Sequence, residues 1–210
     1  MKTTINSYRF YISSENEGKV REIKQYIKEE CKVATEIIPL TINHLTDEQK
    51  KRYNPVEDGE SFLENARIKA RALFSIVNAP VIADDSGLEV DLLNGDPGVF
   101  SSRYEKTDEL RIAKLLNELK NQPSHLKTAR FISCICFIDK TGNEIFFNGK
   151  VEGLIINEPR GKNGFGYDPV FLYQPMNKTF GELLPEEKQV VSHRSKALKL
   201  FLQFLDRYIA

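Results

Sequence analysis

The stretch SFLENARIKARALFSIVNAPVIADDSG, residues 61–87, predicts a helix that is followed directly by a buried strand. Ser61 and Glu64 have the spacing of a capping box, in which each side chain bonds a free backbone N–H at the helix start. Apolar side chains then recur at helical spacing, at Phe62, Ala66, Ala70, Leu73 and Val77. Residues 80–83 are a short apolar run typical of a strand, and this run ends on Asp84-Asp85-Ser86-Gly87.

Helices and strands also flank this stretch on both sides. The expected strands are residues 8–14, 33–40, 87–93, 129–139, 144–148 and 150–157. The other expected helices are residues 18–30, 108–120 and 192–208, and the second of these is expected to bury Leu110, Ala113, Leu116 and Leu119. Residues 41–60 are polar and lack a clear period, which predicts a long loop, either a functional lid or a mobile segment. Residues 140–143 predict a hairpin turn.

The length and composition favour one globular domain. The chain has 210 residues, of which 40% are hydrophobic and 29% charged, so it can bury a core and global disorder is excluded. We expect a single domain over residues 1–210, of the α/β or α+β kind.

The charge balance bears on partners and location. Thirty basic and thirty acidic residues give a formal net charge of zero, which argues against a general nucleic-acid binder. No apolar run approaches the roughly 18 residues of a membrane span, so no membrane partner is expected. Residues 1–11 are polar and lack a signal-peptide core, which favours the cytoplasm.

The cysteines and histidines do not suggest a zinc site. Cys134 and Cys136 alternate in a predicted strand, so they should share one face as small core residues. The three histidines have no zinc-ligand spacing.

Residues 13–19, Ser-Ser-Glu-Asn-Glu-Gly-Lys, join a predicted strand to a predicted helix. Backbone N–H groups at the helix start, together with Lys19, would form an anion site suited to a polyphosphate. The P-loop spacing is absent, because Gly18 lacks an earlier glycine and Lys19 lacks a following Ser or Thr. An ordinary capped helix start is the alternative.

Asp84 and Asp85 end a short strand. Successive strand residues point to opposite faces, so at most one of these carboxylates should face a given cleft. A carboxylate there suits a hard cation such as Mg²⁺, or a water that must lose its proton. The alternative is a solvated turn, in which Asp-Ser-Gly is common.

Residues 161–168, Gly-Lys-Asn-Gly-Phe-Gly-Tyr-Asp, place three glycines around two aromatic rings. Glycine lets the backbone approach a ligand closely, and Phe165 or Tyr167 offers a ring for base stacking. The alternative is a tight loop with two core aromatics.

Lys188, His193 and Arg194 lie around the start of the last predicted helix. Cations there oppose the helix dipole unless an anion or an acceptor is present, which hints at a binding site. A solvated basic turn is the alternative.

Taken together, these segments resemble the inosine/xanthosine triphosphate pyrophosphatase family, which removes deaminated purine nucleotides. The resemblance runs from Ser13 to Ala197. Its strongest stretches are residues 61–70, 83–88, 97–104, 163–169 and 185–194. It implies an elongated, two-lobed α/β fold around a long mixed sheet with flanking helices, and an active site in the cleft between the lobes. It also implies a homodimer and the Mg²⁺-dependent hydrolysis of ITP, dITP and XTP to the monophosphate and pyrophosphate.

The resemblance also implies roles for particular residues. Asp85 would be the catalytic base and a metal ligand, and Glu57, or else Asp58, would support Mg²⁺. Residues implied to bind phosphates are Ser14, Glu15, Asn16, Glu17, Gly18, Lys19, Lys69 and Ser86. Residues implied to surround the base and sugar are Phe165, Gly166, Tyr167, Asp168, Lys188, His193 and Arg194.

The chain departs from the family pattern at Glu15, where a small residue is usual. A carboxylate there either tilts to solvent or weakens phosphate binding. Two other functions therefore stay open: a pyrophosphatase of this fold for other modified nucleotides, and a nucleotide-binding sensor without turnover.

Overall fold

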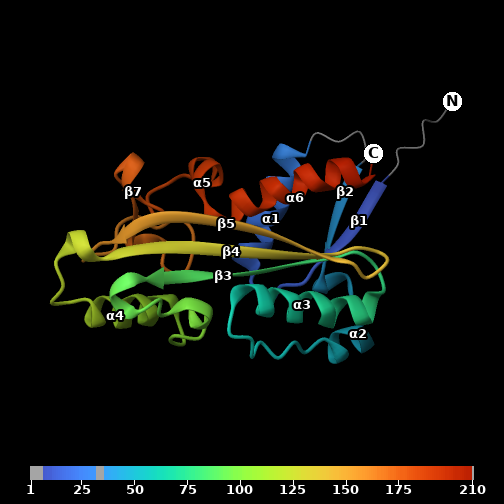
Figure 1. The fold of residues 1–210 in the computed structure, drawn as a ribbon, viewed down its shortest axis with the longest axis horizontal. Coiled ribbons are helices and arrows are strands. Elements are labelled where there is room, and N and C mark those ends of the chain that lie inside the picture. The colour runs from blue at the N-terminus through green and yellow to red at the C-terminus, as the bar shows by residue number, and fades with distance from the viewer. Residues whose placement is uncertain (1–6, 32–35, 210) are drawn as a thin grey trace. The chain divides into compact units, whose positions relative to one another are not determined.

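The computed structural model describes residues 7–31 and 36–209. Its strands are β1 (Ser7–Ile12), β2 (Glu36–Thr41), β3 (Val81–Val90), β4 (Thr128–Ile138), β5 (Glu144–Ile155), β6 (Phe171–Tyr173) and β7 (Lys178–Thr179). Its α-helices are α1 (Glu17–Glu30), α2 (Asp47–Arg52), α3 (Phe62–Val77), α4 (Asp108–Glu118), α5 (Pro185–Val191) and α6 (His193–Ile209), drawn in Figure 1. None of the helices in these residues is long and apolar enough to cross a membrane.

The strands form one seven-stranded mixed sheet in the order β2-β1-β3-β4-β5-β6-β7. Strand β1 pairs in parallel with both β2 and β3, whereas β6 pairs antiparallel with β5 and β7. Helices separate the parallel strands along the chain, as crossover connections require. The α/β class with a mixed sheet and flanking helices is therefore confirmed.

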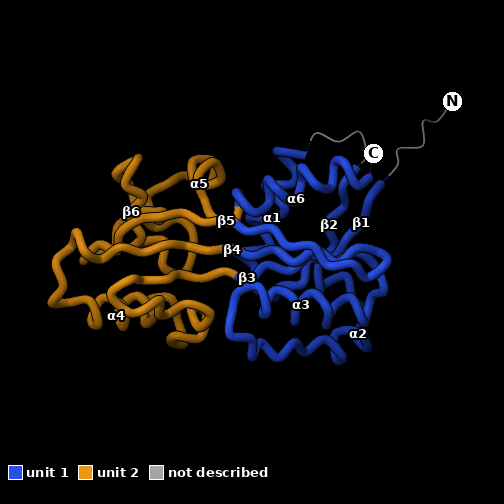
Figure 2. The backbone as a smooth tube through the Cα atoms, viewed as in Figure 1, with its two compact units in different colours: residues 1–85, 134–148, 195–210 blue, residues 86–133, 149–194 orange. Residues whose placement is uncertain are grey.

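The chain divides into two compact units (Figure 2). Unit 1 comprises residues 1–85, 134–148 and 195–210, and unit 2 comprises residues 86–133 and 149–194. Each of β3, β4 and β5 contributes residues to both units. The single domain over 1–210 stays a prediction.

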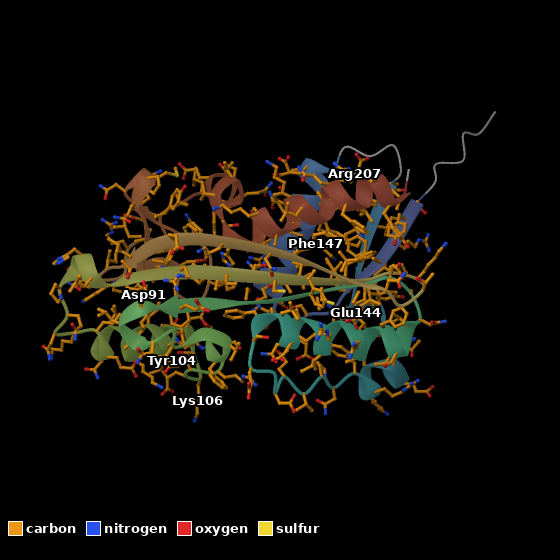
Figure 3. All side chains as sticks on the ribbon, viewed as in Figure 1. Asp91, Tyr104, Lys106, Glu144, Phe147 and Arg207 are labelled. Carbon is orange, nitrogen blue, oxygen red and sulfur yellow. The ribbon has the colours of Figure 1, made fainter. Side chains whose placement is uncertain are left out.

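Helices cover both faces of the strands in unit 1 (Figure 1). On one face α1 and α6 pack against β1, β4 and β5 in a core that includes Phe10, Phe137, Phe147 and Phe201. On the other face, Arg67 and Arg71 of α3 pair with Glu144 of β5. The side chains of Glu144 and Phe147 therefore lie on opposite faces of the sheet (Figure 3).

The start of α3 confirms Ser61 as the N-cap, but the second bond of the predicted capping box is absent from it. The Ser61 hydroxyl accepts from the Glu64 N–H at 3.2 Å, whereas the Glu64 carboxylate bonds the N–H of Glu60, one residue before the position that a capping box specifies. Cys134 and Cys136 are both buried, as expected of small core residues.

The core of unit 2 is rich in phenylalanine. Phe131 contacts Phe171 and Phe180 with ring centroids 4.7 and 5.8 Å apart. Helix α4 adds Ile112 and Leu115 to this core, and its C-cap residue adds Leu119.

The predicted buried face of α4 was wrong. Leu110 is 49% exposed and Ala113 is also exposed, and Leu116 is only partly buried, although Leu119 is buried as predicted. Two overlapping sets of apolar residues recur at helical spacing here, and packing against the unit 2 core selects the set that contains Ile112 and Leu115.

Three further differences are local. Residues 41–60 are not one loop, because Thr46 and Gln49 form a capping box that starts α2. Strand β5 runs unbroken through Gly149, where two strands were expected. The short helix α5 was not predicted. Residues 33–35 of the second predicted strand lie outside the described residues.

The predicted turn between β4 and β5 is confirmed, and Asp139 holds it. Its carboxylate accepts from the backbone N–H groups of Thr141 and Asn143 at 2.7 and 3.0 Å, and from both of their side chains. Burial acts in the opposite direction, but these hydrogen bonds lower the pKa of Asp139 to about 2. The charged form is therefore the one that the fold stabilises.

We expect Asp139→Ala to lower the free energy of unfolding at pH 6 by about 1–3 kcal/mol, because four donors lose a charged acceptor. A folded-state pKa below the unfolded value contributes stability above pH 4 that is lost as pH falls towards 2. The difference between variant and wild type should therefore shrink at pH 3 in urea unfolding. A difference that stays constant from pH 6 to pH 3 would contradict this account.

Candidate active site

The loop between β1 and α1 forms a capped helix start. The Asn16 side chain accepts from the Lys19 N–H at 2.9 Å, and the Ser14 hydroxyl accepts from the Asn16 N–H at 3.2 Å. Glu15, Asn16 and Glu17 are exposed, whereas Ser14 is buried and Gly18 and Lys19 are partly buried. The helix start thus directs backbone N–H groups outward beside a lysine, an arrangement that can bind an anion.

Asp84 and Asp85 are both buried in β3, so the solvated turn is excluded. Asp84 pairs with Lys19 of α1 at 3.3 Å, and Asp85 pairs with Lys69 of α3 at 2.6 Å. Because α1 and α3 lie on opposite sides of the strands in unit 1 (Figure 1), the two carboxylates point to opposite faces, as the strand alternation predicts.

Lys69 joins two carboxylates. Its ammonium lies 2.6 Å from Asp85 Oδ1 and 3.1 Å from Glu57 Oε2, and both the Lys69 and the Asp85 side chains are over nine-tenths buried. Burial acts to lower the pKa of Lys69, but Asp85 and Glu57 raise it above its usual value, so the ammonium stays charged. Burial raises the pKa of Asp85, against the opposing effect of Lys69 and Lys19.

The second oxygen of Asp85 is the unusual atom of this group. Asp85 Oδ2 is buried and has no hydrogen-bond partner among the described residues. A buried carboxylate oxygen without a partner is costly, and a cation or a water can satisfy it. We refer to Lys19, Glu57, Lys69, Asp84 and Asp85 as the Asp85 cluster.

The residues of the Asp85 cluster fit an Mg²⁺ site whose remaining ligands come from the substrate and water. No preformed group of three or more His, Cys, Asp or Glu side chains that could hold a metal exists among the residues described. Mg²⁺ is commonly held by one or two carboxylates, with substrate phosphates and waters completing its shell, so Asp85 and Glu57 suffice. Glu57 is partly buried and reaches Lys69, whereas the neighbouring Asp58 is exposed, which favours Glu57 as the second carboxylate.

A second cluster lies within unit 2 around Phe165. Asp168 Oδ2 accepts from the Phe165 N–H at 2.8 Å and from Lys188 Nζ at 2.6 Å. A Cβ on Gly164 would lie 1.9 Å from this oxygen, so the loop needs glycine there. Lys188 Nζ and Arg194 Cζ lie 5.0 and 5.7 Å from the centre of the Phe165 ring. Two cations therefore flank one aromatic ring.

Arg194 links this ring to the strand that carries Asp85. It is 2% exposed, and its guanidinium donates to Ser86 Oγ at 2.7 Å. The solvated basic turn is excluded for Lys188, His193 and Arg194, because all three are buried. We refer to Ser86, Phe165, Asp168, Lys188 and Arg194 as the Phe165 cluster.

Two other predicted residues pack into the core of unit 2. The His193 ring stacks on Phe131 with centroids 4.8 Å apart. Tyr167 is 3% exposed, and its hydroxyl donates to the Ser101 carbonyl at 3.1 Å. Of the two aromatic rings in the glycine loop, Phe165 is therefore the one available for stacking. Gly166 donates its N–H to Asp108 at 2.7 Å.

Sequence reasoning missed the residues that hold these clusters in place. They are Tyr53, Asn65 and Asp108. Ser13, which bonds Tyr53, lies in the segment 13–19 that was expected to bind an anion. Asp108 carried a signal, since it lies in the first turn of a predicted helix, where a carboxylate is favoured. Tyr53 carried none.

This fold defines an α/β protein in which unit 1 holds a buried cluster of carboxylates and lysines and unit 2 holds an aromatic ring flanked by two cations. The sequence matches the model of the Ham1 family over residues 10–204, and the chain belongs to this family.

Individual relatives agree with this assignment. A protein of Treponema denticola named dITP/XTP pyrophosphatase is 40% identical, with 94% of this chain and 98% of that protein covered. One of Bacillus subtilis with the same name is 41% identical, with 93% and 96% covered. The structure of the Staphylococcus aureus Ham1 protein is 37% identical, covers 95% of this chain and 99% of its own, and has a TM-score of 0.81.

The exposure of Glu15 leads to a prediction about anion binding. An exposed charge acts weakly through water, so Glu15→Gly should change the affinity for inorganic tripolyphosphate by less than about twofold at low salt. Lys19→Ala removes a cation at the helix start and should weaken binding about tenfold. Isothermal titration calorimetry measures both. Clearly tighter binding by the Glu15 variant would show that this carboxylate faces the anion.

Proposed function

We propose that this Ham1-family protein hydrolyses deaminated purine nucleoside triphosphates, dITP, ITP and XTP, to the monophosphate and pyrophosphate. Its family membership and the names of its relatives support the reaction. The observation that supports it within the molecule is the buried carboxylate of Asp85, of which Lys69 holds one oxygen while the other has no partner in the part of the chain that the structure describes.

The reaction needs a water to attack the α-phosphorus while the bond to the departing pyrophosphate breaks. We assign the role of base to Asp85 Oδ2, which would take the proton of this water. Lys69 fixes the carboxylate by holding Oδ1, so the free oxygen has a defined direction. Burial raises the pKa of Asp85, which makes its carboxylate a stronger base.

The phosphates would be held by the start of α1, residues 14–19, together with Lys69 and Ser86. The helix start supplies N–H groups and Lys19 supplies charge, and both stabilise the negative charge that develops on a leaving pyrophosphate. Mg²⁺, which Asp85 and Glu57 would hold, supplies Lewis-acid stabilisation of the phosphate oxygens when bound. Two carboxylates and substrate oxygens match the ligands that this ion prefers.

The base would stack on Phe165, within the loop of Gly166, Tyr167 and Asp168. Asp168 fixes this loop by accepting from the Phe165 N–H, while Tyr167 anchors it in the core. Lys188 and Arg194 flank the ring, and His193 supports the start of α6 through its stacking on Phe131.

The homodimer rests on the resemblance alone and the cytoplasmic location on the sequence analysis alone, and both are part of the proposal. Sedimentation or size exclusion of the purified chain tests the first. The side chain of Glu15 is exposed, so this residue no longer favours a nucleotide-binding sensor without turnover.

Asp85→Asn should lower kcat at least about 10²-fold, because it removes a base and a ligand charge at nearly constant shape. Pyrophosphate release from ITP at saturating Mg²⁺ measures this, and thermal unfolding confirms that the variant is folded. Asp58→Asn is the matched control, since this neighbour of Glu57 is exposed, and its kcat should stay near that of the wild type. Near-normal turnover by Asp85→Asn would show that another residue is the base, and Asp84 would be the first candidate.

The cations around Phe165 predict selectivity for 6-oxo purines. Lys188 and Arg194 each carry several N–H donors, which can bond a 6-oxo group but not the amino group of adenine. Sites built to bond a substrate group reject analogues without it by roughly 10⁴-fold. We expect kcat/KM for ITP and XTP to exceed that for ATP by this order.

Arg194→Ala should lower kcat/KM for ITP and shrink the ratio of ITP to ATP, because one of the two donors is lost. Arg160→Ala, a change in an exposed arginine of the same unit, should leave the ratio unchanged. GTP also carries a 6-oxo group, so its rate reports separately on rejection of the 2-amino group. Equal values for ATP and ITP in the wild type would rule out this selectivity and favour a broader pyrophosphatase.

A further inference from the structure

Residues 53–60, which connect α2 to α3, carry Glu57 and have no regular secondary structure apart from a bend at residue 60. We call this segment the Glu57 strap. A segment without ladder hydrogen bonds samples many conformations unless its ends are fixed. Glu57 Oε2 lies 3.1 Å from Lys69 Nζ. To keep this short distance, other contacts must fix the backbone of the strap relative to α3.

Tyr53 fixes the first end of the strap. It is buried, and its hydroxyl lies 2.8 Å from Ser13 Oγ. Ser13 Oγ donates its single proton to the Lys69 carbonyl at 2.7 Å, so the tyrosine must be the donor to Ser13. Burial raises the pKa of Tyr53, so its hydroxyl keeps this proton at neutral pH.

Gly59 fixes the other end. Its N–H donates to Asn65 Oδ1 at 2.9 Å, and Asn65 is fully buried in α3. A Cβ on Gly59 would lie 2.7 Å from the Cβ of Glu64 and 2.9 Å from Asn65 Oδ1, so the close approach requires glycine. The strap is therefore held at two points, four residues before Glu57 and two residues after it.

Both fixed points of the strap are linked to α3. The first, Tyr53, is linked to Lys69 through Ser13. Lys69 contacts the strap through its carbonyl, by way of Ser13 and Tyr53, and through its ammonium, which meets Glu57. We propose that Tyr53 is a positioning residue for the divalent cation: by bonding Ser13 it holds the strap so that Glu57 stands beside Asp85. This rests on the metal role of Glu57 in the proposed function.

The test compares Tyr53→Phe with Tyr26→Phe, a change in another buried tyrosine of unit 1. Loss of one buried hydrogen bond corresponds to roughly a threefold to tenfold effect on an equilibrium. Tyr53→Phe should therefore raise the Mg²⁺ concentration for half-maximal activity by about three- to tenfold. Its kcat at saturating Mg²⁺ should stay within about twofold, because no reacting atom is touched.

Two measurements on the enzyme without nucleotide keep the test independent of turnover. Hydrogen exchange of residues 54–60 should be faster in Tyr53→Phe than in Tyr26→Phe. Binding of Mn²⁺, followed by the loss of its free electron-spin-resonance signal, should weaken in the same order. Gly59→Ala disturbs the second end of the strap and should shift Mg²⁺ dependence in the same direction, so the proposal remains testable if Tyr53→Phe is poorly folded.

Glu57→Gln separates the metal role of Glu57 from the positioning role of Tyr53. If it shifts Mg²⁺ dependence while Tyr53→Phe and Gly59→Ala match the wild type, the positioning role is overturned and the proposed function stands. If Glu57→Gln itself leaves Mg²⁺ dependence unchanged, the metal role of Glu57 fails, and the inference fails with it. A fall in kcat without any change in Mg²⁺ dependence or exchange would also overturn the positioning role.

Discussion

The buried ion pair of Asp85 and Lys69 is the interaction around which the candidate site in unit 1 is arranged. Removing two charges from water costs several kcal/mol for each ion, and their attraction offsets this only with good geometry and further hydrogen bonds. Here the carboxylate is only half satisfied, because Oδ1 lies 2.6 Å from Lys69 Nζ and Oδ2 has no partner within residues 7–31 and 36–209. A purely structural pair would be expected to satisfy both oxygens. The arrangement therefore keeps a strong acceptor ready for a ligand.

The charges of the two clusters differ in sign. On the α3 side of β3, Lys69 stands against Asp85 and Glu57, which gives a net charge of −1, whereas Lys19 and Asp84 balance each other on the opposite face. Lys188 and Arg194 stand against Asp168 alone, so the Phe165 cluster has a net charge of +1. The first cluster attracts a cation, which can then accompany phosphates, and the second offers donors to a carbonyl.

The sequence predicted most of the elements and part of the site. The N-cap at Ser61 and the apolar start of β3 follow from local patterns, and these held, although β3 continues through Asp84 and Asp85 to Val90. The face of α4 did not, because Leu110 and Ile112 head two overlapping apolar sets and only the unit 2 core chooses between them. Tyr53 was out of reach for a different reason. Its bond to Ser13 joins residues 40 positions apart, and Ser13 bonds Lys69 across 56 positions, distances at which no local pattern acts.

The way that the strands are shared between units has a consequence for synthesis of the chain. The core of unit 1 combines Phe10 of β1 with Phe201 of α6, from opposite ends of the described chain. The ribosome synthesises β1 long before α6, and the blue-to-red colouring of Figure 1 follows this order of synthesis. Apolar surface on β1 and α1 must stay without its native partners until translation is nearly complete. Proteins with such long-range contacts fold slowly and expose aggregation-prone surface meanwhile. Expression at low temperature or with abundant chaperones should therefore favour this fold more than one built from consecutive segments.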